Sequence, residues 1–148
     1  MEELARLRLL EWRSFGDVSY TVMPDRIEAG TILCAVAATG GEVELKNVEP
    51  KHMTSVLHKL EEAGCKIKIG NRTISLDAPK KLKAIDIKTM PHPGFPTDMQ
   101  SVFAAMLATA KGTSTIEENI FENRFKYAND LNKMGAKLKS VRRKCDCN

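Results

Sequence analysis

Residues 90–100 read MPHPGFPTDMQ and run directly into an apolar helical pattern over residues 101–110. The three prolines fix φ and disfavour helix in the residues before them, so we expect an extended, stiff segment that ends where a helix begins. Thr97 and Gln100 have the spacing of a capping box, which predicts a helix start at Thr97. Asp98 would then lie in the first helical turn, beside the positive end of the helix dipole. A carboxylate there either stabilises its helix or serves as a base or hydrogen-bond acceptor for a ligand.

The composition is that of a globular protein. The 148 residues are 43% hydrophobic and 28% charged, enough for one domain with an ordinary core or for two small similar units. No apolar run approaches the roughly 20 residues that span a bilayer, and the N-terminus lacks the apolar core of a secretion signal, so we expect a cytoplasmic protein without a membrane partner. The net charge of +4 gathers at Lys80, Lys81 and Lys83 and at the C-terminus, without interleaved aromatic residues, which argues against a nucleic-acid partner.

The four cysteines do not have the spacing of zinc ligands, so we expect no metal site. Cys34 and Cys65 stand among apolar neighbours and are predicted to be small core residues. Cys145 and Cys147 follow a basic run, and we expect them in a polar tail.

Two successive segments show one order of predicted elements, βαβαββ. The first unit spans residues 18–78, the second unit spans residues 84–140 and carries the candidate site, and a lysine-rich linker joins them. Residues 1–17, with a short helix predicted over 1–13, and residues 141–148 are expected outside both units. The first unit has predicted strands at 18–23, 43–45, 66–69 and 73–76 and helices that Asp25 and Pro50 open and that Gly40 and Gly64 end. The second unit has predicted strands at 84–88, 114–118 and 136–140 and helices at 97–110 and 124–134.

The two units match closely in register. Gly41, Leu60 and Gly64 recur 71 residues later as Gly112, Leu131 and Gly135, and Pro24, Asp25 and Glu28 match Pro96, Thr97 and Gln100 at an offset of 72. Arg26 occupies the slot of Asp98, so the shared scaffold does not require an acid there. The helices should pack together through apolar stripes, which are Ile32, Val36, Leu57, Leu60, Val102, Met106, Ala128 and Leu131.

Asp98 and Arg124 are predicted to approach each other from adjacent helix N-termini. Backbone amides at such a place favour anions, so a carboxylate, a guanidinium and free amides together suit a polar, anionic substrate. Arg124 could instead pair with Asp98 or Glu122, or remain solvated. His92, between two prolines, could contact a ligand or simply be exposed.

Five motifs resemble the UDP-N-acetylglucosamine enolpyruvyl transferases, also called UDP-N-acetylglucosamine 1-carboxyvinyltransferases. They are PDRIEAGT (24–31), KLEEAGCKI (59–67), PHPGFPTDMQ (91–100), IFENRF (120–125) and MGAKL (134–138). The resemblance covers about residues 18–139 and implies part of an inside-out α/β barrel, here two βαβαββ repeat units. It implies that Asp98 contacts the sugar nucleotide and is the base for its 3-hydroxyl, that Ile120 also contacts UDP-N-acetylglucosamine, and that Arg124 supports the site. The implied reaction belongs to peptidoglycan biosynthesis, uses UDP-N-acetylglucosamine and phosphoenolpyruvate as substrates, and needs no cofactor.

The sequence also departs from that family. The family enzymes carry a second globular domain in which a cysteine-bearing loop, a Lys-Asn pair and several arginines meet phosphoenolpyruvate, and we find no match to these features. We therefore assign no catalytic cysteine and expect this chain alone to be inactive. Residues 1–17 and 141–148 do not follow the family pattern. One alternative is a truncated, non-catalytic paralogue that binds sugar nucleotide or a partner protein, or that self-associates through exposed surfaces. Another is an enolpyruvyl transferase for a different acceptor, against which FPTDMQ and FENRF argue.

Overall fold

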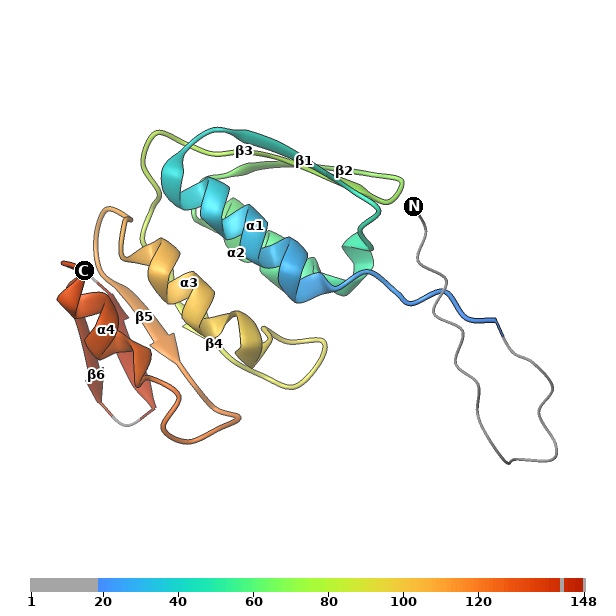
Figure 1. Cartoon of the computed structure of the whole chain (residues 1–148). Helices are drawn as coiled ribbons and strands as arrows, with labels where there is room; N and C mark the ends of the chain where they lie inside the picture. Colours follow the sequence, from blue (N-terminus) through green and yellow to red (C-terminus); the bar gives the residue numbers. More distant parts are fainter. Residues whose placement is uncertain (1–18, 142, 148) are drawn as a thin grey trace, which may run out of the picture.

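The computed structural model describes residues 19–141 and 143–147, and within them the helices and strands form two successive groups (Figure 1). The helix predicted over residues 1–13 lies outside the described residues. The first group consists of α1 (Arg26–Thr39), β1 (Glu42–Lys46), a 3-10 helix (Pro50–His52), α2 (Thr54–Glu62), β2 (Lys66–Gly70) and β3 (Thr73–Asp77). The second group consists of β4 (Ile87–Lys88), a 3-10 helix (Thr97–Met99), α3 (Gln100–Leu107), β5 (Ser114–Glu117), α4 (Tyr127–Lys133), β6 (Leu138–Val141) and β7 (Lys144–Cys147).

Each group has its own sheet, and the two sheets share one strand order. In the first sheet β3 lies between β1 and β2 and is antiparallel to both. In the second sheet β7 lies between β5 and β6, again antiparallel to both. The short strand β4 adds a parallel partner outside β5, and among the described residues no strand takes the corresponding place outside β1. The second sheet therefore repeats the first with one strand added.

The helices lie inside and the sheets outside. Figure 1 shows α1, α2 and α3 between the two sheets, and α1 packs directly against α3, against α2 and against strands of the first sheet. The sheets do not close on each other within the described residues. The predicted fold class, part of an inside-out α/β barrel, is confirmed.

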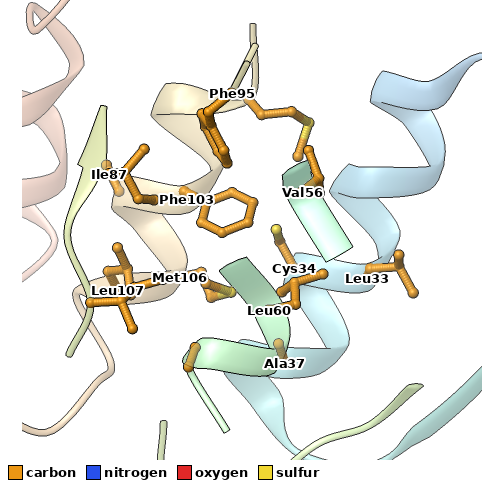
Figure 2. Packing of buried hydrophobic residues seen from close by; sticks show 14 of the residues in the cluster. Leu33, Cys34, Ala37, Val56, Leu60, Ile87, Phe95, Phe103, Met106 and Leu107 are labelled. Atoms are coloured by element: carbon orange, nitrogen blue, oxygen red, sulfur yellow. The ribbon is translucent and has the colours of Figure 1, made fainter. Parts of the chain in front are cut away.

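One hydrophobic core joins the three inner helices. Leu33 of α1, Leu60 of α2 and Phe103 of α3 are fully buried, and Figure 2 shows these side chains in one cluster. Gly30 allows α1 to approach Met99 closely, since a Cβ at Gly30 would lie 2.8 Å from Met99 Cε. Met99, which ends the 3-10 helix at the candidate site, is thus packed against α1 of the first repeat unit.

The predicted apolar stripes are buried or partly buried except at Ile32, which is 41% exposed. Placing Ile32 in the core was wrong. The α1 sequence, RIEAGTILCAVAAT, is apolar on more than one side, so its periodicity does not determine which side faces inward.

Glycines at matching positions adopt matching backbone conformations. Gly64 follows the end of α2 with φ 105°, and Gly135 follows the end of α4 with φ 101°. Gly41 and Gly112 have φ 123° and 113°. Positive φ is a conformation that glycine adopts without the steric cost a Cβ brings, so these four positions support the predicted register of the repeat.

Several predicted boundaries are wrong. Residues 19–23 are not in a strand, because no described strand lies beside them to accept their hydrogen bonds. The strand predicted over 84–88 is reduced to β4 for the same reason, since only Ile87 and Lys88 pair with β5. The last helix begins at Tyr127 instead of Arg124, because residues 124–126 form a tighter turn, in which the Ala128 N–H donates to the Phe125 carbonyl three residues back at 3.0 Å.

The polar tail expected at the C-terminus is also wrong. Lys144–Cys147 forms β7, the strand between β5 and β6, and both Cys145 and Cys147 are fully buried. Side chains alternate across a strand, so KCDC places its two thiols on the inner face and its charged residues on the outer face. The charged residues of this segment suggested a polar tail, although its two cysteines recur at every second residue, the period of a strand.

Candidate functional site

The segment that leads into the candidate site is a closed turn and not the extended arm expected from its prolines. The backbone N–H of Met90 donates to the carbonyl of Phe95 at 3.0 Å, which joins the two ends of the turn. The Phe95 ring packs edge-on against Phe103, with 4.9 Å between the ring centroids. This anchor fixes the turn just before Thr97, while His92 is exposed at its tip.

The predicted capping box is wrong. The Thr97 hydroxyl donates to Glu118 Oε2 at 2.7 Å, and the Gln100 side-chain oxygen accepts a hydrogen bond from the Tyr127 hydroxyl at 2.9 Å. Neither side chain caps the helix start. In a capping box the threonine oxygen accepts from a backbone N–H of the first turn. Here the Thr97 hydroxyl donates to the buried Glu118 carboxylate and its oxygen accepts from Arg124, so both of its hydrogen bonds lead away from its own helix.

The structure brings Asp98 and Arg124 together, as predicted. Asp98 lies in the 3-10 turn before α3, and Arg124 lies in the loop before α4. Arg124 NH1 donates to Asp98 Oδ1 at 3.2 Å and to Thr97 Oγ1 at 2.8 Å. The side chains of Asp98 and Arg124 are 61% and 38% exposed, so solvent weakens this ion pair and a ligand can reach both groups.

Two large apolar side chains are exposed on the loop that leads to Arg124, and one of them contacts it. The Arg124 guanidinium lies over the Phe121 ring, 5.0 Å from its centroid, a cation–π contact. Phe121 is 53% exposed and Ile120 is 37% exposed, on the loop between β5 and α4. The site thus combines a carboxylate, a guanidinium and an accessible apolar surface.

Glu118 is the site residue that our sequence reasoning missed. It is 1% exposed. Its Oε1 accepts from Thr89 Oγ1 at 2.8 Å, from the Ile120 amide at 2.8 Å and from the Phe121 amide at 3.1 Å, and its Oε2 accepts from Thr97. Burial alone would raise the pKa of Glu118, but these four hydrogen bonds outweigh it, and the pKa lies below its ordinary value. Strand periodicity could have found this residue, because Ser114, Ile116 and Glu118 alternate onto the buried face.

A separate groove of about 1020 Å³ lies between α2 and the outer face of the second sheet. Its lining includes Ser55, His58, Lys88 and Lys144, and it includes none of Asp98, Ile120 and Arg124. The candidate site is therefore an open surface rather than part of this groove.

Within the described ranges, no group of three or more His, Cys, Asp or Glu side chains could hold a metal ion. Cys34 and Cys65 are buried, as expected. Burial, together with the charge of Asp77, raises the pKa of Cys65 to about 11, and burial also raises the pKa of Cys34, so both thiols stay protonated and unreactive. No helix of the described chain is long and apolar enough to cross a membrane.

The chain is similar to curated carboxyvinyltransferases. It is 53% identical over 125 residues to UDP-N-acetylglucosamine 1-carboxyvinyltransferase 1 of Symbiobacterium thermophilum, which covers 84% of this chain and 28% of that protein. It is 54% identical over 124 residues to UDP-N-acetylglucosamine 1-carboxyvinyltransferase of Desulfofundulus thermocisternus, which covers 84% of this chain and 51% of that protein. The chain thus spans about half or less of the length of these relatives.

Solved structures share the fold. The enolpyruvyl transferase NikO from Streptomyces tendae superposes with a TM-score of 0.73 at 22% identity, over 87% of this chain and 31% of that chain. EPSP synthase from Acinetobacter baumannii superposes with a TM-score of 0.63 at 16% identity, over 82% of this chain and 28% of that chain.

The sequence model of the family described as EPSP synthase (3-phosphoshikimate 1-carboxyvinyltransferase) matches residues 13–146, nearly the whole chain. This match covers residues 13–17 and 141–146, including most of β7, so our prediction that residues 1–17 and 141–148 depart from the family pattern is wrong for these parts. The resemblance inferred from the five motifs is confirmed at the level of the family. The two curated relatives compared above are UDP-N-acetylglucosamine 1-carboxyvinyltransferases. This chain belongs to the EPSP synthase family of carboxyvinyl (enolpyruvyl) transferases.

Proposed function

We propose that this chain is part of a transferase that moves the enolpyruvyl group of phosphoenolpyruvate to the 3-hydroxyl of UDP-N-acetylglucosamine. The observation that carries the proposal is 53–54% identity to relatives that bear this name. The reaction would place the protein in peptidoglycan biosynthesis and cell-wall biogenesis, and through them in cell shape, the cell cycle and cell division. We also keep the division into units 18–78 and 84–140 as a proposal, with the second unit extended to include β7.

The proposed roles follow from the exposed pair. Asp98 takes the proton of the sugar 3-hydroxyl as that oxygen adds to C2 of phosphoenolpyruvate and C3 gains a proton. C3 then loses a proton as the bond from C2 to the phosphate oxygen breaks, which restores the double bond and releases phosphate. Arg124 contacts Asp98 at one carboxylate oxygen, which orients the carboxylate while the side chain remains open to a ligand. Ile120 supplies apolar contact to the sugar nucleotide.

We propose further that the chain alone does not catalyse enolpyruvyl transfer. Catalysis depends on groups placed around both substrates, and the residues that meet phosphoenolpyruvate in the family lie in a domain that this chain does not match. A site that is open on one side buries little of the ligand's surface. We therefore expect UDP-N-acetylglucosamine to bind with a Kd in the millimolar range, a binding free energy of about −4 kcal/mol.

The test measures phosphate release and, by ligand-observed NMR, the binding of UDP-N-acetylglucosamine. The variants are Asp98→Ala and the matched control Asp130→Ala, which also removes an exposed, paired aspartate. We expect no phosphate release above the blank and binding that is weakened only by Asp98→Ala. Phosphate release by the chain would refute the proposed inactivity, and equal binding by wild type and Asp98→Ala would remove Asp98 from the site.

A further inference from the structure

Glu118 is a buried carboxylate whose role the proposed reaction does not explain. A charged group is expensive to remove from water unless hydrogen bonds replace its hydration. Here four donors do so, and three of them belong to residues that adjoin the candidate site: Thr97, Ile120 and Phe121. The carboxylate therefore connects segments that are far apart in sequence but meet at the site.

The hydrogen bonds through Thr97 have a fixed direction. A hydroxyl carries one proton, and Thr97 gives it to Glu118 Oε2 at 2.7 Å. The oxygen of Thr97 is then free to accept from Arg124 NH1 at 2.8 Å, and the same NH1 reaches Asp98 Oδ1 at 3.2 Å. Because a carboxylate can only accept, it forces Thr97 to present a lone pair to Arg124.

The other oxygen of Glu118 holds the loop whose Phe121 ring contacts Arg124. Oε1 binds the backbone amides of Ile120 and Phe121, and the Phe121 ring lies 5.0 Å below the guanidinium. One buried carboxylate thus fixes both the hydroxyl that contacts Arg124 and the loop residue whose ring contacts it.

We propose that Glu118 is a positioning residue of the sugar-nucleotide site, which holds Arg124 against Asp98 through the Thr97 hydroxyl and the Ile120–Phe121 loop. The identity of the ligand rests on the proposed function. The orientation of Arg124 does not, and it can be measured without any ligand.

Glu118→Gln is the sharpest perturbation, because it keeps the shape of the side chain and replaces one acceptor by a donor. If the amide oxygen keeps the three donors at Oε1, the amide nitrogen faces Thr97. Thr97 must then accept from Gln, and its own proton is no longer held by a carboxylate, so the lone pair that faces Arg124 is no longer fixed in place. If the amide flips, its nitrogen meets the donors at Oε1 and the loop is released instead. Either outcome weakens the hold on Arg124.

The experiment is a double-mutant cycle of wild type, Glu118→Gln, Thr97→Val and the double variant. In the ligand-free chain, NMR follows the Arg124 guanidinium and the Ile120 and Phe121 amides; with UDP-N-acetylglucosamine, it gives the Kd. We expect each single variant to shift the Arg124 signals and weaken binding about tenfold, the worth of one hydrogen bond to a charged group. The double variant should be no weaker than the single ones.

Three further variants make the result decisive. Glu117→Gln removes the neighbouring acid, which pairs with Lys88 at 3.8 Å, and should leave the Arg124 signals unchanged. Thr97→Ser keeps the hydroxyl and should preserve them, whereas Thr97→Val should not; this pair decides the question even if Glu118→Gln does not fold. Glu118→Asp keeps the charge on a shorter side chain and should restore the Arg124 signals in part.

Unchanged Arg124 signals in Glu118→Gln and Thr97→Val, or effects that simply add in the cycle, would overturn the proposal. If no variant and no wild-type sample binds UDP-N-acetylglucosamine while the Arg124 signals respond as expected, the proposed ligand is wrong and the positioning role stands.

Discussion

The contact between Phe95 and Phe103 gives the most direct test of how the core supports the site. Phe103 is the largest fully buried side chain of residues 19–140 and 143–147, and its ring meets Phe95 edge-on at 4.9 Å and 86°. Phe103→Ala should lower the free energy of unfolding by about 3–5 kcal/mol, from lost burial and the cavity that remains. Phe103→Leu and Phe95→Leu should each cost less, and the cycle between them should show a coupling of about 0.5–1.5 kcal/mol, the worth of an aromatic pair beyond its buried area.

Urea unfolding followed by circular dichroism measures these changes. With a slope of about 2 kcal/mol/M, Phe103→Ala should lower the midpoint by about 1.5–2.5 M. Phe95→Leu should also speed hydrogen exchange at the Met90 amide, which closes the turn onto Phe95. The control Phe121→Leu removes a half-exposed ring outside the core, so it should cost no more than about 1 kcal/mol. Additive effects of Phe95→Leu and Phe103→Leu, with Met90 exchange unchanged, would refute the claim that this pair anchors the turn.

Two further predictions concern acid stability and the repeat. The pKa of folded Glu118 lies below its unfolded value of about 4.3, so the stability that ionised Glu118 contributes is complete above that pH and is lost as the pH falls through the lower, folded pKa. Urea titrations should show the difference in unfolding free energy between wild type and Glu118→Gln becoming smaller below about pH 4. A difference that stays constant with pH would contradict this. Gly64→Ala and Gly135→Ala should each cost about 1–2 kcal/mol in urea unfolding, because both positions have φ above 100°; a loss at only one of them would show that the two helix ends are not equivalent.

The sequence predicted the parts of the fold that depend on local rules. Prolines, glycines and apolar spacing located the four helices and the repeat, and the Asp98–Arg124 pair followed from placing two motifs near adjacent helix starts. Strand ends and the orientation of α1 depend on neighbours that are distant in sequence. Residues 19–23, for which a strand was predicted, show this, because an extended segment forms a strand only where it can hydrogen-bond to a second strand.

The two repeat units show why the site residue Glu118 escaped the same rules. In the first unit Asp25 caps α1, accepting a hydrogen bond from the Ile27 amide at 2.7 Å, a contact typically worth about 1 kcal/mol. Thr97 stands in the matching slot of the second unit, but its hydroxyl leaves the helix for Glu118, and the position that matches Glu118 in the first unit is the exposed Asn47.

The second unit thus forgoes a local cap and buries a charge whose hydration four hydrogen bonds replace. Neither is needed by the scaffold, since the first unit adopts the same strand order and helix ends without them. What they produce together is a guanidinium held between a hydroxyl and a ring, beside an accessible carboxylate. When one repeat unit departs from local structural preferences and the other does not, the departure marks a candidate binding site. Here that departure leads to Asp98 and Arg124, the same residues that the motifs had indicated.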